Sequence, residues 1–112
     1  MDCIFCKIAN KEIPSTVVYE DDKVLVFEDL DPQAPLHLLL IPKQHIGSLD
    51  EMEEEDIELV GYINYLAARI ARDKGLEKGY RLLTNCGEDG GQTVGHLHYH
   101  LLGARSLQWP PG

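Results

Sequence analysis

The chain has 112 residues, of which 44% are hydrophobic and 26% are charged, which suits one globular domain over residues 1–112. Its formal net charge of −9 argues against non-specific binding to nucleic acid or an anionic membrane, because a phosphate backbone would be repelled. No apolar run approaches the ~20 residues that cross a bilayer, and no secretory signal pattern opens the chain, so we expect a cytoplasmic protein.

The predicted elements are strands joined by hairpins, with one long helix and a short one. Residues 3–10 form a short helix or turn. Five segments have the composition of strands: residues 16–20, 23–29, 36–41, 80–84 and 96–102. Asp21 and Asp22 lie between the first two strands, which indicates a tight hairpin. Hairpin-linked strands with one long helix favour an α+β fold with an antiparallel sheet over a doubly wound fold.

The long helix is predicted over residues 50–74, where apolar side chains recur at helical spacing. Ser48 with Glu51, or Asp50 with Glu53, could form its capping box. Gly75 is placed to be the left-handed residue just past its end. Seven acids between residues 50 and 58 are interpreted as a solvated helix N-terminus, where negative charge complements the helix dipole.

Three of the five histidines alternate in the sequence His96-Leu97-His98-Tyr99-His100. In a regular strand these imidazoles would share one face, with the residues between them facing the core. One interpretation is a metal site, although same-face residues lie ~6.6–7 Å apart and three cannot easily reach one ion. The other is nucleophilic catalysis, since a neutral histidine has a free lone pair once its second ring nitrogen is fixed by a hydrogen bond.

A glycine-rich loop over residues 87–92 lies just upstream of the histidines. Its backbone N–H groups can form a nest for an anion, and Gln92 and Thr93 could add donors. Beside a row of imidazoles, such a loop favours a phosphate site.

The histidine pattern resembles the signature of the histidine triad (HIT) superfamily, in which three histidines alternate with hydrophobic residues. Residues 29–37 resemble the family's segment before the third strand, and the resemblance covers nearly the whole chain. The ending Trp109-Pro110-Pro111-Gly112 resembles the Hint branch rather than the Fhit-like dinucleoside polyphosphate hydrolases. The resemblance implies a HIT-like fold with five antiparallel strands, one long helix and a short N-terminal helix. It also implies a homodimer with two nucleotide sites.

The resemblance further implies a hydrolase that cleaves nucleoside 5'-phosphoramidates or acyl-nucleotides to a monophosphate such as AMP or GMP. His98 would be the nucleophile and form a covalent nucleotidyl-histidine, His100 would contact the phosphate, and His37 and His96 would complete the histidine network. Asp29 would take the ribose hydroxyls. The other nucleotide-binding residues implied are Asn85, Gln92 and Thr93 around the phosphate, Ile4, Phe5, Ile8, Phe27 and Leu30 around the base, and Trp109 near the partner subunit's site.

Cys3 and Cys6 form a C-x-x-C pair. The pair could be two buried packing residues, and a redox dithiol would normally stand in a βαβ context that is missing here. Resemblance to bacterial HIT proteins implies instead a structural Zn²⁺ held by Cys3, Cys6, His45 and His96. His96 can turn away from His98 only if the strand begins irregularly, which Gly95 would allow. Cys86 is interpreted as a packing residue.

Three alternatives to the phosphoramidase remain. Within the family, the chain could be a dinucleoside polyphosphate hydrolase or a nucleotidyltransferase, against which the Trp109 tail argues. It could be a nucleotide-binding interaction protein with incidental catalysis. It could also be a metal-dependent hydrolase that uses the histidine row.

Overall fold

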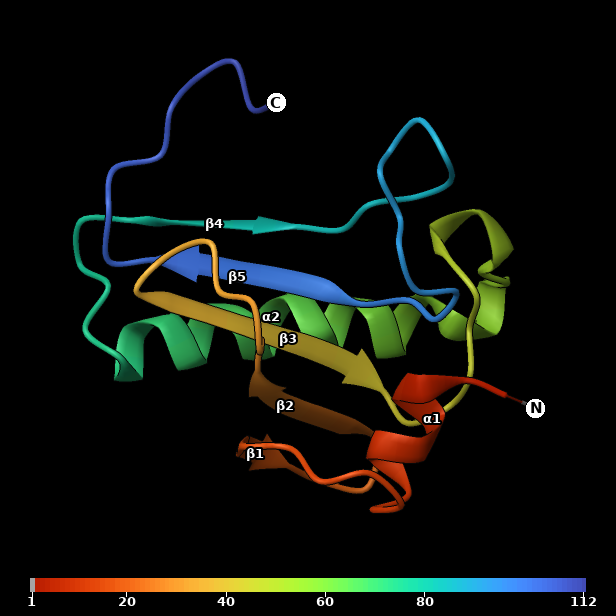
Figure 1. Cartoon of the computed structure of the whole chain (residues 1–112). Helices are drawn as coiled ribbons and strands as arrows, with labels where there is room; N and C mark the ends of the chain where they lie inside the picture. The colour runs from red at the N-terminus through yellow and green to blue at the C-terminus, as the bar shows by residue number, and fades with distance from the viewer. Residues whose placement is uncertain (1) are drawn as a thin grey trace.

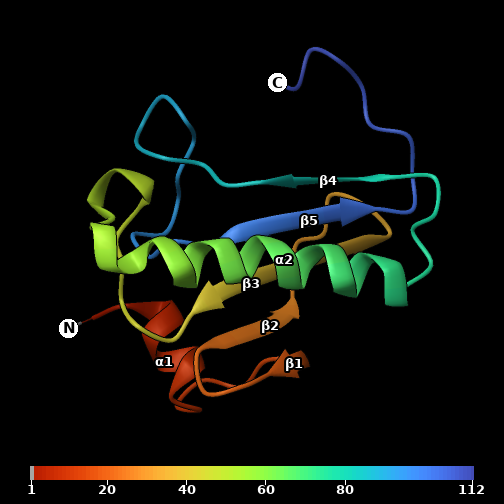
Figure 2. The same ribbon diagram turned by 180° about the vertical axis from the view of Figure 1, so that it is seen from behind.

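Five strands form one antiparallel sheet in the order β1-β2-β3-β5-β4. The strands are β1 (Val17–Glu20), β2 (Val24–Glu28), β3 (Leu36–Pro42), β4 (Tyr80–Leu83) and β5 (Tyr99–Gly103). The long helix α2 (Ile57–Asp73) crosses one face of the sheet, and the short helix α1 (Ile4–Ala9) lies at one end of it (Figures 1 and 2). This is a computed structural model, which describes residues 2–112. The predicted α+β fold is confirmed.

The central strands β2 and β3 are buried on both faces, so successive residues of each strand pack into different cores. Leu38 and Leu40 belong to the core between the sheet and α2, together with Ile63 of the helix. Leu39 and Ile41 face the other way and pack into a smaller core with the residues of α1. The second core therefore fixes α1 against the sheet beside the histidines.

The predicted hairpin turn at Asp21 is confirmed. The Asp21 carboxylate accepts hydrogen bonds from the backbone amides of Lys23 and Val24, each at 2.8 Å. It also accepts from the hydroxyls of Tyr19 and Tyr62, which joins the hairpin to α2. Burial raises the pKa of Asp21, but these hydrogen bonds outweigh burial and hold the pKa below its ordinary value.

The predicted start of the long helix is wrong. Two short 3-10 turns, η1 (Leu49–Glu51) and η2 (Glu54–Asp56), precede α2, which begins only at Ile57. The capping box forms between Glu53 and Asp56 rather than at the expected positions. Asp56 is buried and accepts hydrogen bonds from the Gln44 side chain at 3.2 Å and the Glu53 backbone at 3.0 Å. Acidic side chains compete for backbone N–H groups, so a run of them favours successive caps over a continuous helix.

The predicted end of the helix is confirmed, since Gly75 follows it with a φ of 77°. Among the residues that the structure describes, no helix is long and apolar enough to span a membrane.

Candidate active site and metal centre

The last strand begins later than its alternating histidines predict. β5 starts at Tyr99 rather than at residue 96, and the backbone amide of Leu97 donates to Ile46 outside the β5 ladder. The ring of Phe5 packs edge-on against both His96 and His98, which places both imidazoles on the α1 side of the sheet. Their partners nevertheless differ, because His96 is fully buried beside the cysteines whereas His98 lies 5.0 Å from His100 between ring centres. The strand therefore begins irregularly after Gly95 as expected, but His96 does not turn to the opposite face, and it reaches the cysteines from the α1 side that it shares with His98.

A cavity of about 290 Å³ lies between α1, the sheet and the segment before β5. His98 and His100 line it on one side, and Asp29 and Thr93 add polar groups. Its apolar lining contains all five residues expected around a base: Ile4, Phe5, Ile8, Phe27 and Leu30. The structure thus brings most of the expected nucleotide site together around one cavity.

Three of the expected nucleotide residues do not line this cavity: Asn85, Gln92 and Trp109. The Gln92 amide nitrogen donates to the carbonyls of Gly47 at 2.8 Å and Val94 at 2.9 Å, and its oxygen accepts from the Gly87 amide. Gln92 therefore braces the glycine-rich loop, and both of its amide hydrogens have protein acceptors. Trp109 is 81% exposed on the segment after β5.

The tautomer of His98 follows from its hydrogen bond. Its Nδ1 lies 2.7 Å from the main-chain carbonyl oxygen of His96. A carbonyl oxygen only accepts, so Nδ1 carries the ring proton and donates it. In neutral His98, Nε2 then has the free lone pair that a nucleophile needs.

A second set of hydrogen bonds fixes His37 and His100. The backbone amide of Gln33 donates to Nδ1 of His37 at 3.0 Å, so the proton of neutral His37 lies on Nε2. That Nε2–H lies 2.9 Å from Nδ1 of His100 and 3.3 Å from a carboxylate oxygen of Asp29. Nδ1 of His100 therefore accepts, and its own proton lies on Nε2. The two cavity imidazoles have opposite polarity, with a lone pair on His98 and a donor on His100.

Both supporting imidazoles are neutral near pH 7. Burial outweighs the opposing effect of the Asp29 and Asp31 carboxylates and holds the pKa of His37 below its ordinary value. Burial, and next the neighbouring His98 and His37, lower the pKa of His100 to about 4. His100 is therefore a hydrogen-bond donor to a bound anion rather than a proton donor in the cationic form.

The other cluster consists of Cys3, Cys6, His45 and His96, whose ligand atoms all lie within 4.8 Å of one another. Nδ1 of His96 lies 3.3 Å from Sγ of Cys3, 3.6 Å from Sγ of Cys6 and 3.1 Å from Nδ1 of His45. Bond lengths of ~2.3 Å to sulfur and ~2.0–2.1 Å to nitrogen give tetrahedral edges of about 3.6 Å (S···N) and about 3.4 Å (N···N). The cluster thus has nearly the size of a tetrahedral zinc site.

The protonation of His96 also suits a metal ligand. Nε2 of His96 lies 2.9 Å from the carbonyl oxygen of Pro42, so Nε2 carries the proton and Nδ1 presents its lone pair to the cluster. Burial lowers the pKa of His96, which keeps the ring neutral. Burial and the neighbouring Cys3 raise the pKa of the Cys6 thiol in the metal-free protein, and a bound cation would reverse that effect.

Comparisons with known proteins agree with this geometry. The sequence profile described as "Scavenger mRNA decapping enzyme C-term binding" matches residues 2–108. A HIT family hydrolase from Legionella pneumophila, known from its crystal structure, is 52% identical with a TM-score of 0.97, over 99% of this chain and 100% of its own. The chain belongs to the histidine triad (HIT) family.

Two curated relatives of this HIT protein bear functional names. The 14 kDa zinc-binding protein of Zea mays is 56% identical over 97% of this chain and 87% of its own length. Adenylylsulfatase HINT1 of Arabidopsis thaliana is 51% identical over 97% of this chain and 76% of its own. These relatives and the family support a hydrolase of nucleotide substrates.

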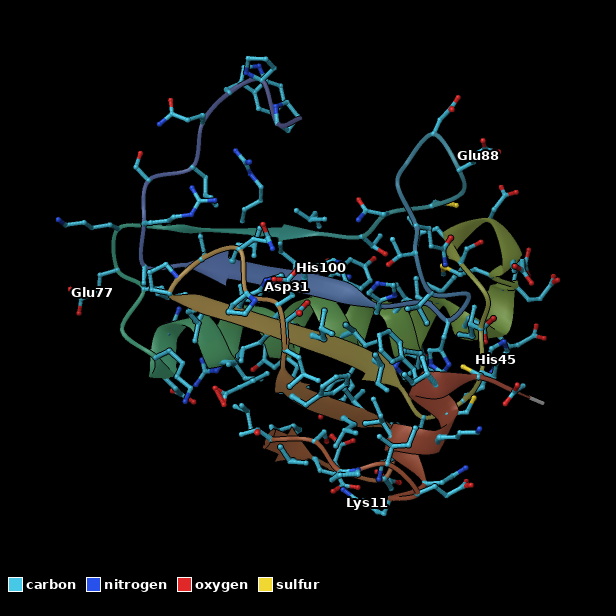
Figure 3. All side chains as sticks on the ribbon, viewed as in Figure 1. Lys11, Asp31, His45, Glu77, Glu88 and His100 are labelled. Atoms are coloured by element: carbon cyan, nitrogen blue, oxygen red, sulfur yellow. The ribbon has the colours of Figure 1, made fainter. Side chains whose placement is uncertain are left out.

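A third group, Asp29, His37 and His100, also has ligand atoms close enough for a metal ion. Its hydrogen bonds do not suit one. Because the Gln33 amide already occupies the lone pair of His37 Nδ1, a metal on Nε2 would require an imidazolate or the loss of that hydrogen bond. The donors that suit a metal are therefore those of the cysteine cluster and not those of the cavity. In Figure 3, His45 of the cysteine cluster lies beside α1 and His100 of the cavity lies on β5.

Several cavity residues escaped the sequence analysis: Ile13, Pro14, Ser15, Glu28, Leu39 and Val94. Ile13, Pro14 and Ser15 lie in the connection after α1, where no periodic pattern indicates which side chains turn inward. Leu39 could have been found, because it alternates with the core residues Leu38 and Leu40 and so faces the α1 side.

Proposed function

We propose that this HIT protein hydrolyses nucleoside 5'-phosphoramidates, and acyl-nucleotides, through a covalent nucleotidyl intermediate on His98. The observation that carries the proposal is the opposite polarity of the two cavity imidazoles. The His98 lone pair can attack phosphorus, while the His100 Nε2–H donates to a phosphate oxygen. The names of the Legionella hydrolase and the Arabidopsis adenylylsulfatase support nucleotide hydrolysis in general.

The reaction has two displacements at phosphorus. Nε2 of His98 forms a bond to phosphorus as the P–N bond breaks, and the leaving amine takes its proton from water because neutral His100 is a poor acid. The positive charge that develops on His98 is stabilised by the carbonyl of His96 at Nδ1. Water then attacks the phosphorus, which releases the nucleoside monophosphate and a proton and restores the neutral imidazole.

The cavity supplies groups for the rest of a purine nucleotide. One carboxylate oxygen of Asp29 accepts from the Asp31 amide and the other lies 3.3 Å from Nε2 of His37, and the lone pairs that remain on both oxygens can accept from the ribose hydroxyls. Phe5 and Phe27 pack edge to face with centroids 5.7 Å apart, and both rings offer apolar surface to a base. We also propose a homodimer in which Trp109 lies near the partner subunit's site.

The cysteine–histidine cluster is proposed to hold one structural Zn²⁺. Four protein donors close the coordination sphere, so the metal would fix geometry without taking part in the reaction. The name of the maize relative supports zinc as the ion. Bound zinc would link three parts of the chain: Cys3 and Cys6 at α1, His45 after β3, and His96 before β5.

Single-turnover mixing with adenosine 5'-phosphoramidate, followed by intact-protein mass spectrometry, tests the enzyme proposal. A transient adenylyl adduct on His98 is expected in the natural protein and no adduct in His98→Ala, which should still bind AMP. Near-normal turnover in His98→Ala would overturn the nucleophile assignment. Tight AMP binding without adduct or AMP release in the natural protein would favour a nucleotide-binding interaction protein instead.

A further inference from the structure

We infer that Arg105, which lies outside the cavity, is a positioning residue that sets the protonation pattern of His37 and His100. The inference rests on the proposed function for its kinetic consequence. Its structural part concerns the tautomers of two imidazoles and stands apart from any reaction.

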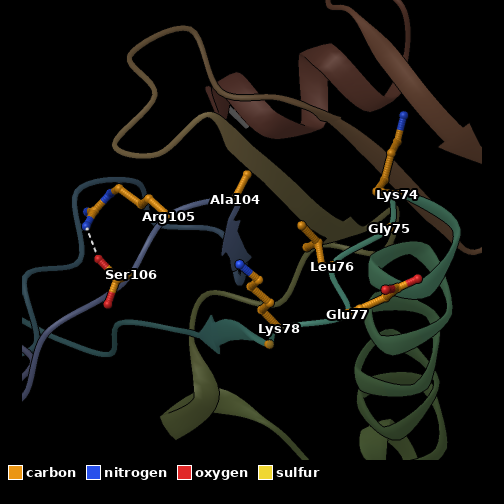
Figure 4. Close-up of a pocket in the computed structure, with 9 residues that line it drawn as sticks. Lys74, Gly75, Leu76, Glu77, Lys78, Ala104, Arg105 and Ser106 are labelled. Carbon is orange, nitrogen blue, oxygen red and sulfur yellow. Dashed lines mark hydrogen bonds between the residues drawn. The ribbon is translucent and has the colours of Figure 1, made fainter.

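Arg105 reaches the loop before β3 from the C-terminal segment. β5 ends at Gly103, and Ala104 then turns the chain with a φ of 68°. Nε of Arg105 donates to the carbonyl of Gln33 at 3.0 Å. Nη1 donates to the carbonyl of Ser106 at 3.1 Å, the contact that is dashed in Figure 4. The guanidinium thus ties the segment after β5 to a loop 72 positions earlier in the chain.

That loop controls His37. Gln33 lies between β2 and β3, outside the ladder, and its own amide N–H determines which nitrogen of His37 carries the proton. Within the loop, the Gln33 side chain donates to the Asp31 carbonyl at 2.9 Å. The hydrogen bond from Arg105 adds a contact between Gln33 and a segment distant in the sequence, so it limits the movement of Gln33 relative to the sheet.

Release of Gln33 would let both rings change tautomer without any change in charge. If His37 moves its proton to Nδ1, its Nε2 becomes an acceptor, and His100 must then hold its proton on Nδ1 to keep the hydrogen bond between them. Nε2 of His100 would present a lone pair to the cavity. A phosphate oxygen would meet that lone pair instead of a donor, which removes a stabilising contact in the transition state.

A second contact limits the size of this effect. The Asp29 carboxylate lies 3.3 Å from His37 Nε2 and favours the same tautomer that Gln33 fixes. Loss of Arg105 should therefore shift the tautomer populations only in part. We expect a loss in rate of at most about fivefold, the factor that complete loss of roughly one net hydrogen bond would give.

The turn before Arg105 supports a positional role. Ala104 adopts a left-handed conformation that costs a residue with a Cβ about 1–2 kcal/mol. Such conformations persist where the surrounding structure over-determines them. Arg105 is exposed and lines an open cleft of about 660 Å³, so it can be replaced without disturbing a core.

Arg81 provides a matched control. It is also an arginine whose guanidinium donates to a main-chain carbonyl, that of Gln108 at 2.9 Å, but it makes no contact with Gln33. Arg105→Gln removes the contacts with Gln33 and Ser106, Arg81→Gln removes the contact with Gln108, and each variant removes one positive charge. Only Arg105→Gln should change the tautomers of His37 and His100.

The experiment measures the ring-nitrogen ¹⁵N spectra of His37 and His100, with the single-turnover rate on adenosine 5'-phosphoramidate. Arg105→Gln should show a new Nδ1–H population in both rings and a rate that is lower by at most about fivefold. Arg105→Lys should recover part of both effects, and Arg81→Gln should match the natural protein. Unchanged tautomers in Arg105→Gln, or the same rate loss in Arg81→Gln, would overturn the inference. If the natural protein has no phosphoramidase activity, the proposed function fails while the spectra still decide the role of Arg105.

Discussion

His100 should make this HIT protein lose stability as the pH falls below neutrality. Its pKa is about 4 in the folded protein against 6.5 ordinarily, because burial and the neighbouring His98 and His37 disfavour its charged form more than Asp29 favours it. Between these two values the unfolded chain binds a proton at this position and the folded chain does not. The contribution of His100 to stability is therefore intact above pH 6.5 and is lost as the pH falls towards 4.

The size of the effect follows from the same values. A tenfold change in proton affinity is worth about 1.4 kcal/mol, so the difference between 6.5 and about 4 amounts to about 3 kcal/mol in total. Roughly 2 kcal/mol of that falls above pH 5. His100 is partly exposed, and solvent screening reduces the expected loss between pH 7.5 and pH 5 to about 1.5 kcal/mol.

Urea unfolding of the natural protein and of His100→Asn, each loaded with zinc, isolates this contribution. The Asn side chain keeps an acceptor for His37 but does not titrate, so effects of the carboxylates and of metal release cancel in the difference. The free energy of unfolding of the natural protein should fall by about 1.5 kcal/mol more than that of the variant between pH 7.5 and pH 5. Parallel pH profiles would refute the account of His100 as a neutral buried imidazole.

Three further predictions concern other parts of the molecule. Cys6→Ser should lower zinc content and melting temperature. It should also lower the single-turnover rate, because the His96 ring contacts Cys6 and the His96 carbonyl holds His98. Normal zinc content by mass spectrometry would remove Cys6 from the ligand set. Asp29→Asn should weaken AMP binding more than 2',3'-dideoxy-AMP binding in calorimetry, and equal losses would contradict its contact with the ribose. Ala104→Gly should raise the free energy of unfolding in urea by about 0.5 kcal/mol, since relief of the left-handed strain exceeds the entropy cost of glycine. A lower urea midpoint in this variant than in the natural protein would argue against strain in this turn.

The sequence allowed the sheet, the hairpin at Asp21 and the cavity histidines to be predicted because each depends on a local pattern. A nearly continuous apolar run identifies β3, and three alternating histidines identify β5 and the segment before it, which line the cavity. The start of α2 could not be predicted in the same way. Every residue of the acidic run can cap a helix, and the choice of Glu53 and Asp56 depends on Gln44, which reaches Asp56 from a different segment.

The protonation pattern of the site could not be predicted from side chains, because main-chain groups determine it. The amide of Gln33 and the carbonyls of Pro42 and His96 each fix one ring, and any residue at those positions except proline at 33 could provide the same group. Arg105 has no signal of its own either. Its importance arises from the fold, which places the turn after β5 beside the loop before β3.

His96 links the two sites through different parts of one residue. Its side chain lies among the cysteine and histidine donors, and its carbonyl oxygen accepts a hydrogen bond from Nδ1 of His98, 2.7 Å away. A movement of the ring that follows loss of a metal would be transmitted to the carbonyl, because both belong to one residue. The late start of β5 at Tyr99 then has a physical reason, since a regular ladder through residues 96–98 would fix that carbonyl to another strand and leave His98 Nδ1 without its acceptor. The irregular strand thus keeps the nucleophile in the tautomer with a free Nε2.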